Sequence, residues 1–251
     1  MSNGQMRIEC GGGLDAYLAA ADETSAELLA SDEGLLATLR TYDHHFRTKL
    51  FATTMAADPI ALVLFMNAYQ MFLASVRTAV SGHSVAVFPL LRTALESAAY
   101  GSLIIAEPSL GSTWTQRHRD DQAKAACRKA FTFAKALAPL KAKAPDIHAL
   151  AIIGYDSAID FGAHPNIKGV FGHVSIDENR PDDVVAVSHT SLYGATHIET
   201  VRALCACLDF GLAIIGVTAL ASSKVPQEVA EDLQALSDAK NTATAPYSAP
   251  A

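Results

Sequence analysis

The sequence has few charged residues, few aromatic residues and few cysteines, and each shortage narrows the class of protein. Of its 251 residues, 18% are charged, 7% are aromatic and four are cysteines, whereas 50% are apolar. A chain with this apolar content can bury a core, so it is not intrinsically disordered. Four cysteines do not make a disulfide scaffold, and 15 glycines with 10 prolines exclude a collagen-like chain.

The motifs of the common enzyme classes are also missing. The sequence contains no phosphate-binding loop, no Gly-x-Ser-x-Gly elbow, no His-Glu-x-x-His pair and no dinucleotide-binding fingerprint. The Glu-x-x-His signature of helical di-iron proteins is absent as well. We therefore assign no cofactor, and whether the protein is an enzyme stays open.

The net charge of −7 is unevenly distributed along the chain. Residues 1–36 carry seven acids and one base, whereas residues 109–145 carry eight bases and two acids. An acidic chain is a poor general binder of nucleic acid, because that affinity comes largely from neutralising phosphates. The basic stripe over residues 117–135 is either a solvated face that complements the acidic termini or a local patch for a partner.

Three apolar stretches, residues 59–76, 85–106 and 203–221, approach the length of a membrane span. Polar residues interrupt them, such as Gln70 in the first and Asp209 in the third. We expect buried helices of a soluble protein with no membrane span, although the first stretch is borderline. The N-terminus lacks a signal-peptide pattern, which favours a cytoplasmic location.

The apolar periodicity predicts an all-α, single-domain bundle of about seven to eight helices. Asp58-Pro59 is a strong helix start and Ser81-Gly82 a stop. We expect the bundle over residues 14–240, after a flexible segment 1–13 and before a disordered tail 241–251. The predicted helices cover residues 14–30, 32–51, 59–80, 84–106, 112–137, 145–161, 191–221 and 226–239.

Residues 163–189 differ in kind from the rest of the chain. Two short β-branched runs flank an Asp-Glu-Asn-Arg-Pro turn there, which predicts one long irregular loop or a small hairpin.

Two polar features stand out within these apolar surroundings. Arg92 and Glu96 lie four residues apart on an apolar helix, where charged groups are costly unless they are paired. The second feature is the end of the helix that precedes His164, where an imidazole close to carboxylates can act as an acid, a base or a ligand. The sequence therefore predicts a polar pocket built from Arg92, Glu96, Tyr155, Asp160, His164 and Asn166.

A structural interpretation of the same residues is available. They can form a buried polar network that fixes helix packing, in which His164 and Asn166 cap the helix end and pin the loop that follows.

A metal site would require further contacts. His189, Tyr193 and His197 are spaced by four, which would place them on one face at the start of the seventh predicted helix. With Asp156, Asp160 or Glu96 opposite them, they could complete a ligand set. A histidine near a helix start is more often structural, so no metal is assigned.

The Arg92-Thr-Ala-Leu-Glu96 helix and the Gly162-Ala-His-Pro-Asn166 turn carry a family resemblance. Together they resemble uncharacterised bacterial helical families that share an R-T-x-x-E helix and a downstream H-P-N turn, over roughly residues 60–220. Those families are loosely similar to HEPN (higher eukaryote and prokaryote nucleotide-binding) domains. The resemblance implies an all-helical fold in which Arg92, Glu96, His164 and Asn166 lie close together, but it brings no established activity.

HEPN ribonucleases carry an arginine followed a few residues later by a histidine, and they cut RNA in a dimer cleft. Two such pairs occur here, Arg40 with His45 and Arg77 with His83. A match of this kind is expected by chance, and Thr follows each arginine in place of the residues usual in that family. Neither pair stands in the C-terminal part of the chain, where the family keeps it.

Two functional hypotheses follow from these observations. The leading one is a binding or interaction module that self-associates and has a polar pocket around Arg92, Glu96 and His164. Its ligand would be a small molecule or another protein. The alternative is an enzyme, either a HEPN-like RNase or a metal-dependent helical hydrolase.

Overall fold

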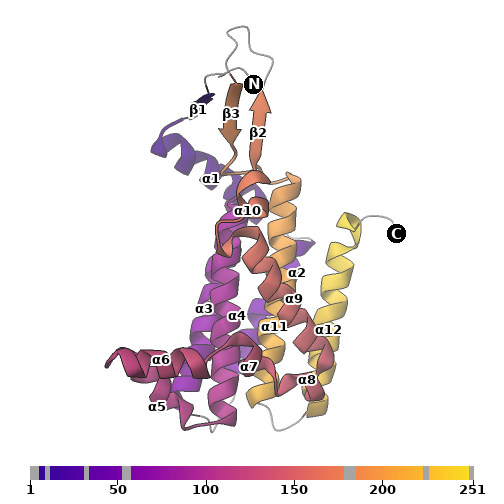
Figure 1. The fold of residues 1–251 in the computed structure, drawn as a ribbon. Coiled ribbons are helices and arrows are strands. Elements are labelled where there is room, and N and C mark those ends of the chain that lie inside the picture. The colour runs from indigo at the N-terminus through magenta and orange to yellow at the C-terminus, as the bar shows by residue number, and fades with distance from the viewer. Residues whose placement is uncertain are drawn as a thin grey trace.

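The computed structural model describes residues 6–8, 12–30, 34–52, 58–177, 185–222 and 226–248. Throughout these ranges the chain is essentially all helical and forms one bundle, with a small sheet at one end (Figure 1). The predicted all-α, single-domain fold is confirmed. The helical segments run from α1 to α12, more than the sequence predicts, because some of the expected helices are divided.

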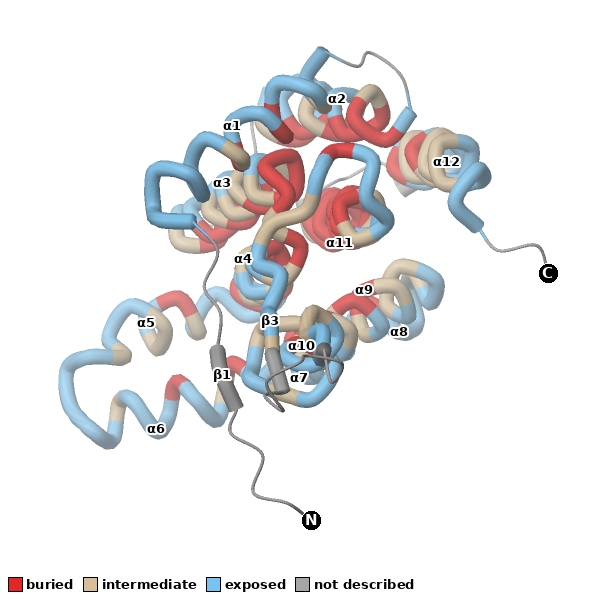
Figure 2. The backbone as a smooth tube through the Cα atoms, turned by 90° about the horizontal axis from the view of Figure 1, so that it is seen from above, coloured by how far each residue is buried: buried red, intermediate tan, exposed pale blue. Residues whose placement is uncertain are grey.

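The bundle is organised around α11 (Ile198–Ser222), its most buried helix. Seen from above, α11 lies in the middle and its neighbours surround it (Figure 2). Large side chains such as Leu208, Ile214 and Ile215 are completely buried along it. The helices packed around α11 are α2 (Leu35–His45), α3 (Pro59–Val80), α4 (Ser84–Ala106), α9 (Pro145–Ala158) and α12 (Pro226–Thr244).

Helices α3 and α4 form an antiparallel pair whose bounds agree with the sequence prediction. Asp58 caps α3, because its Oδ1 accepts a hydrogen bond from the Ile60 amide at 2.8 Å. Between the two helices, Gly82 has a φ of +82°, a backbone conformation that favours glycine. The Tyr193 amide donates to the Gly82 carbonyl at 3.0 Å, so this turn also holds the segment that precedes α11.

Pro89 lies inside α4 and leaves one backbone carbonyl of this helix without its helical hydrogen bond, at the point where another segment packs against α4. Proline has no backbone N–H, so the Val85 carbonyl lacks its usual helical donor. Gly162, in the π-helical segment η2 (Ile159–Ala163), packs against that carbonyl. A Cβ at residue 162 would lie 2.6 Å from the Val85 oxygen, so only glycine permits this approach of η2 to α4.

The prediction of one long helix over residues 112–137 is wrong. This stretch divides into three, because Asp120 and Thr132 cap new helices: Asp120 accepts from the Ala123 amide at 2.7 Å, and Thr132 from the Lys135 amide at 3.4 Å. The resulting helices are α5 (Leu110–Thr115), α6 (Asp121–Ala130) and α7 (Phe133–Leu137), and a short helix α8 (Leu140–Lys143) follows.

The predicted start of the seventh helix at residue 191 is also wrong, since α11 begins only at Ile198. The preceding residues stay irregular because side chains satisfy their backbone groups. Thr200 Oγ1 donates to the Gly194 carbonyl at 2.9 Å, and His197 Nδ1 accepts from the Glu199 amide at 3.1 Å.

The segment 163–189 contains a hairpin, one of the two arrangements predicted, and a short helix α10 (Ile167–Phe171) that the sequence did not indicate. Strand β2 (Val174–Asp177) pairs antiparallel with β3 (Val185–His189), with Ile176 opposite Val187. The Asp-Glu-Asn-Arg-Pro turn falls mostly on residues 178–184, outside the described ranges.

Both ends of the chain are more regular than the sequence predicts. In the N-terminal segment expected to be flexible, Met6–Ile8 form strand β1, which pairs parallel with β3 and precedes α1 (Leu14–Leu29). Near the C-terminus, α12 continues to Thr244, and a 3-10 turn (Ala245–Tyr247) follows it. A π-helical segment η1 (Phe46–Leu50) extends α2.

Within the described ranges, two helices, α3 and α11, are long and apolar enough to cross a membrane by length and composition alone. In the most apolar window of α11, 78% of the residues are buried, which is typical of the core helix of a bundle. The corresponding share in α3 is only 33%. One long side of α3 therefore remains uncovered by the residues that the structure describes.

Replacing Gly82 tests how strongly its turn contributes to the fold. A Cβ at this position would lie 2.2 Å from the Tyr193 carbonyl oxygen, and a positive φ is unfavourable for alanine. We expect Gly82→Ala to lower the free energy of unfolding by about 2–4 kcal/mol. At Gly194 a Cβ would meet nothing within 4 Å, so Gly194→Ala should change that free energy by less than about 1 kcal/mol. Urea denaturation of both variants measures the difference, and equal stabilities would contradict the prediction.

Candidate functional site

Arg92 is the centre of a polar cluster that joins α4 to α9 and to the end of η2. Its Nε donates to Glu96 Oε1 at 3.0 Å, and its Nη2 donates to the Tyr155 hydroxyl at 2.9 Å. Its Nη1 lies 2.6 Å from His164 Nε2. The structure thus brings together four of the six residues in the predicted pocket, which we call the Arg92 cluster: Arg92, Glu96, Tyr155 and His164.

Aromatic packing holds Tyr155 in place within the Arg92 cluster. The Phe133 ring from α7 stacks on the Tyr155 ring, with centroids 4.1 Å apart and an interplanar angle of 11°. The Arg92 guanidinium carbon lies 4.9 Å from the centroid of the same ring. Side chains from α4, α7 and α9 and from the end of η2 therefore come together around the Arg92 guanidinium.

The hydrogen bonds of the Arg92 cluster shift the pKa values of its members. A guanidinium can only donate hydrogen bonds, so the groups around Arg92 act as its acceptors. Burial alone would lower the pKa of Arg92, but Glu96 and Tyr155 outweigh this effect and the pKa is raised. Burial, followed by the nearby Glu96, raises the pKa of Tyr155. The cluster therefore combines the Arg92 cation with one carboxylate, that of Glu96, and with the hydrogen-bonding groups of Tyr155 and His164, a pattern suited to holding helices together.

Asp160 and Asn166 do not join the Arg92 cluster. Asp160 pairs with Lys168 of α10. Asn166 caps α10, since its Oδ1 accepts from the Gly169 amide at 3.0 Å, and its side-chain amide donates to the Ile159 carbonyl. These contacts hold α10 against η2. Asn166 therefore has the structural role given as the alternative in the sequence analysis, in which it caps a helix end and holds the adjoining loop.

The histidines considered as metal ligands lie near the hairpin. His197 stacks on Tyr193 with centroids 4.5 Å apart, and the His173 and His189 rings are 6.2 Å apart. Because α11 starts late, these residues do not share a helical face, and Asp156 is an exposed residue of α9. Among the residues that the structure describes, no group of three or more histidine, cysteine or acidic residues could hold a metal ion.

The two histidines of the ribonuclease-like pairs occupy structural positions. His45 is buried at the end of α2, with 8% of its surface exposed. His83 Nδ1 lies 2.8 Å from Ser81 Oγ, and its ring packs edge-on against Tyr17 at a centroid distance of 5.2 Å. Burial lowers the pKa of His45 and that of His83.

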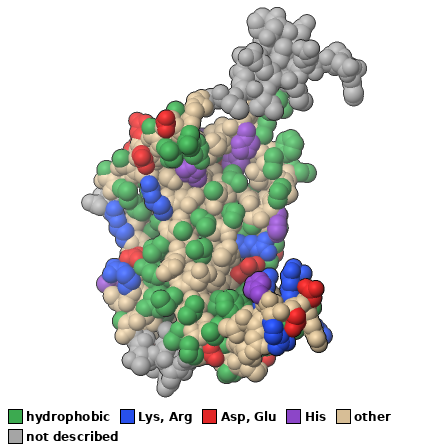
Figure 3. Space-filling model, turned by 90° about the vertical axis from the view of Figure 1, so that its left-hand side faces the viewer, with side chains coloured by type: hydrophobic (Ala, Val, Ile, Leu, Met, Phe, Trp, Pro, Cys, Tyr) green, Lys and Arg blue, Asp and Glu red, His purple; other side chains and the backbone are tan. Residues whose placement is uncertain are grey.

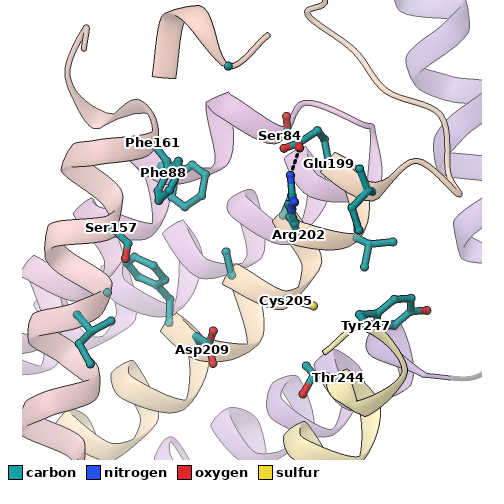
Figure 4. A pocket seen from close by; sticks show the side chains of 18 of the residues that line it. Ser84, Phe88, Ser157, Phe161, Glu199, Arg202, Cys205, Asp209, Thr244 and Tyr247 are labelled. Atoms are coloured by element: carbon teal, nitrogen blue, oxygen red, sulfur yellow. Dashed lines mark hydrogen bonds and ion pairs between the residues drawn. The ribbon is translucent and has the colours of Figure 1, made fainter. Parts of the chain in front are cut away.

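A cavity of about 970 Å³ lies beside the Arg92 cluster, and α11 forms one of its walls. None of the six residues of the predicted pocket lines it. The opposite wall consists of α9 and η2, which contribute Ser157 and Phe161, and α12 supplies the edge with Thr244 (Figure 4). Phe88, one turn before Arg92 on α4, contacts the Phe161 ring at a centroid distance of 5.6 Å.

The cavity combines apolar rings with paired charges. Phe88, Phe161 and Phe210 present aromatic surface, and two ion pairs lie on its wall. Lys240 Nζ bonds Asp209 Oδ1 at 2.7 Å, and Arg202 pairs with Glu199. Arg202, Cys205 and Asp209 follow one another along α11 at this wall (Figure 4).

Two further polar groups line the cavity. Ser84 is buried, with 5% of its surface exposed, and its Oγ has no hydrogen-bond partner among the described residues. Burial and, to a lesser extent, Asp209 raise the pKa of the Cys205 thiol, which keeps it protonated and slow to react.

Sequence reasoning missed the cavity because its lining comes from segments far apart in the chain. Comparison with protein-family models, with curated proteins and with solved structures gave no match. The function is therefore argued from the geometry, and the HEPN-like resemblance stays a prediction.

The Arg92 cluster predicts a measurable loss of stability when its cation is removed. Arg92→Met leaves Glu96 and Tyr155 partly desolvated without their donor, so the free energy of unfolding should fall by about 2–3 kcal/mol. The control is Arg47→Met, because Arg47 pairs with Asp43 at the same spacing and distance but its side chain is 58% exposed. That change should cost less than about 1 kcal/mol. Equal losses in urea denaturation would contradict a special role for Arg92.

Acidification should destabilise the fold through one buried histidine, His45, and two half-buried ones, His83 and His173. Burial lowers the pKa values of His45, His83 and His173 below the ordinary value near 6.5. The unfolded chain therefore binds more protons than the native one just below pH 6.5, and the free energy of unfolding falls as the pH drops.

Urea denaturation between pH 7.5 and pH 5 measures this slope, which His45→Gln should reduce. A free energy of unfolding that stays constant, or that rises toward pH 5, would contradict the prediction.

Proposed function

We propose that the protein is a helical binding protein that holds a small amphipathic organic molecule in the cavity between α9, α11 and α12. The observation that carries this proposal is a cavity of about 970 Å³ whose lining includes aromatic rings and a buried hydroxyl for which the described residues offer no hydrogen-bond partner. Small-molecule sites are usually concave and mostly apolar, with a few placed polar groups and volumes of about 300–1,000 Å³.

The lining defines the chemical class of the ligand. A flat or branched apolar body fits against Phe88, Phe161 and Phe210, because aromatic surface provides most of the free energy of such contacts. The ligand also carries a hydrogen-bonding group for Ser84 Oγ, since an unsatisfied buried hydroxyl costs about 1–3 kcal/mol. The Glu199–Arg202 and Asp209–Lys240 pairs face further polar groups of the ligand.

The Arg92 cluster supports this site without contacting the ligand. Tyr155 and His164 flank the stretch of α9 and η2 that supplies Ser157 and Phe161 to the cavity wall. By tying both sides of this stretch to α4, Arg92 fixes the width of the cavity. The polar centre predicted from the sequence acts in this proposal as a positioning element.

The proposal is tested with 8-anilinonaphthalene-1-sulfonate (ANS), a fluorescent probe that combines aromatic rings with one anionic group. We expect one ANS to bind per chain, with enhanced fluorescence, and to slow the alkylation of Cys205 by iodoacetamide as followed by mass spectrometry. Ala206 lines the cavity, so Ala206→Trp should weaken ANS binding by at least about tenfold by filling the space.

The control is Ala126→Trp, which adds the same side chain to the exposed surface of α6. It should leave both the affinity for ANS and the protection of Cys205 unchanged. If Ala206→Trp remains folded and binds ANS as the wild type does, the cavity is not the binding site and the proposal fails.

A further inference from the structure

The uncovered side of α3 carries a continuous stripe of exposed residues. Val63, Met66 and Leu73 are 56%, 53% and 39% exposed, although each is a large apolar residue. Figure 3 faces this side of the molecule and shows hydrophobic side chains along its middle. We call the set the α3 stripe: Pro59, Val63, Met66, Gln70, Leu73 and Arg77, all of which are exposed.

The spacing of the α3 stripe is that of a helix-pairing seam. Its residues follow one another at intervals of four, three, four, three and four, the alternation of apolar positions in a coiled coil. The residues between them are buried or half-buried against the chain itself, so the stripe is the outward edge of α3.

The positions of the α3 stripe are symmetric about Ala68, because the order of the intervals is the same from either end of the helix. A twofold axis at this level would place Val63 of one copy opposite Leu73 of the other, and Met66 opposite Gln70. Such a surface is complementary to itself when two copies run antiparallel, which is the requirement for a twofold dimer.

Charge favours the antiparallel arrangement over the parallel one. Helix α1 lies at the C-terminal end of α3, where its Ser25 and Asp22 contact Arg77, and it carries four acidic residues and no base. At the other end, α5 lies beside Asp58, and residues 110–130 carry five bases and two acids. Antiparallel copies bring the acidic end of each near the basic end of the other, whereas parallel copies would juxtapose like charges.

We propose that the α3 stripe is the interface of an antiparallel homodimer, in which a second copy of this chain covers α3. Figure 2 shows α3 and α9 on different sides of α11, so the dimer leaves the entrance of the cavity open. The proposal is independent of any ligand in the cavity. It accounts for an apolar helix of which one side is left uncovered by the described part of the chain.

The first test is a sedimentation-equilibrium series of the full chain over a range of protein concentrations. We expect a dimer, and Met66→Glu should raise its dissociation constant at least ~100-fold, because the seam would bury an unpaired carboxylate. The matched control is Ile176→Glu, since Ile176 of β2 is 59% exposed and lies outside the α3 stripe. It should leave the dissociation constant unchanged, and thermal unfolding should show both variants folded.

The second test determines the orientation of the two copies by disulfide formation. Val63→Cys and Leu73→Cys are placed on separate chains carrying different tags, with Cys10 and Cys205 replaced by serine. The antiparallel register predicts a mixed Val63–Leu73 crosslink and little self-crosslinking of either variant.

Three results would overturn the proposal: a monomer at every concentration, a dimer that Met66→Glu leaves intact, or efficient self-crosslinking of each single variant. Partition of the wild type into phosphatidylcholine vesicles, lost in Met66→Glu, would instead identify a lipid surface as the occupant. That result would also overturn the proposal.

Discussion

A guanidinium that is largely withdrawn from water must keep its partners, and this requirement fixes how α9 and η2 sit on α4. The Arg92 side chain is only 21% exposed, and each of its three nitrogens contacts a different residue. Losing any one contact leaves a donor or an acceptor partly desolvated. The cation thus couples α4 to α9 and to the end of η2.

A second constraint acts on the same interface. Pro89 removes a helical hydrogen bond from α4, and Gly162 is small enough to lie against the Val85 carbonyl that this leaves free. The Phe88–Phe161 contact and the Arg92 cluster then follow along the same side of α4. The Gly162–Val85 contact, the Phe88–Phe161 contact and the Arg92 cluster therefore act jointly to position η2 against α4. Because η2 forms part of the cavity wall, the same contacts position that wall.

The sequence predicted the helices best where local chemistry determines their ends. Asp58-Pro59 and Ser81-Gly82 produce the bounds of α3 because a cap and a left-handed glycine act within a few residues. The division of residues 112–137 was not predicted, because Asp120 and Thr132 are capping residues inside an otherwise helical pattern. The late start of α11 depends on side-chain contacts of Thr200 and His197 with the irregular segment, which periodicity does not reveal.

The candidate site was predictable only in part. Arg92 and Glu96 stand out in the sequence because charges are rare on an apolar helix, and the structure places them with Tyr155 and His164. The cavity left no comparable signal. Its rings resemble ordinary core residues, and the missing partner of Ser84 is visible only in three dimensions. The composition of the sequence thus indicated the Arg92 cluster, which positions the cavity wall, better than it indicated the cavity.

Hydrogen–deuterium exchange over residues 145–163 tests most directly whether the Arg92 cluster holds the wall of a binding cavity. The account predicts that ANS slows exchange in this segment of the wild type, and that Arg92→Met accelerates it while α3 is unaffected. Exchange that is unchanged in this segment under both conditions would contradict the account.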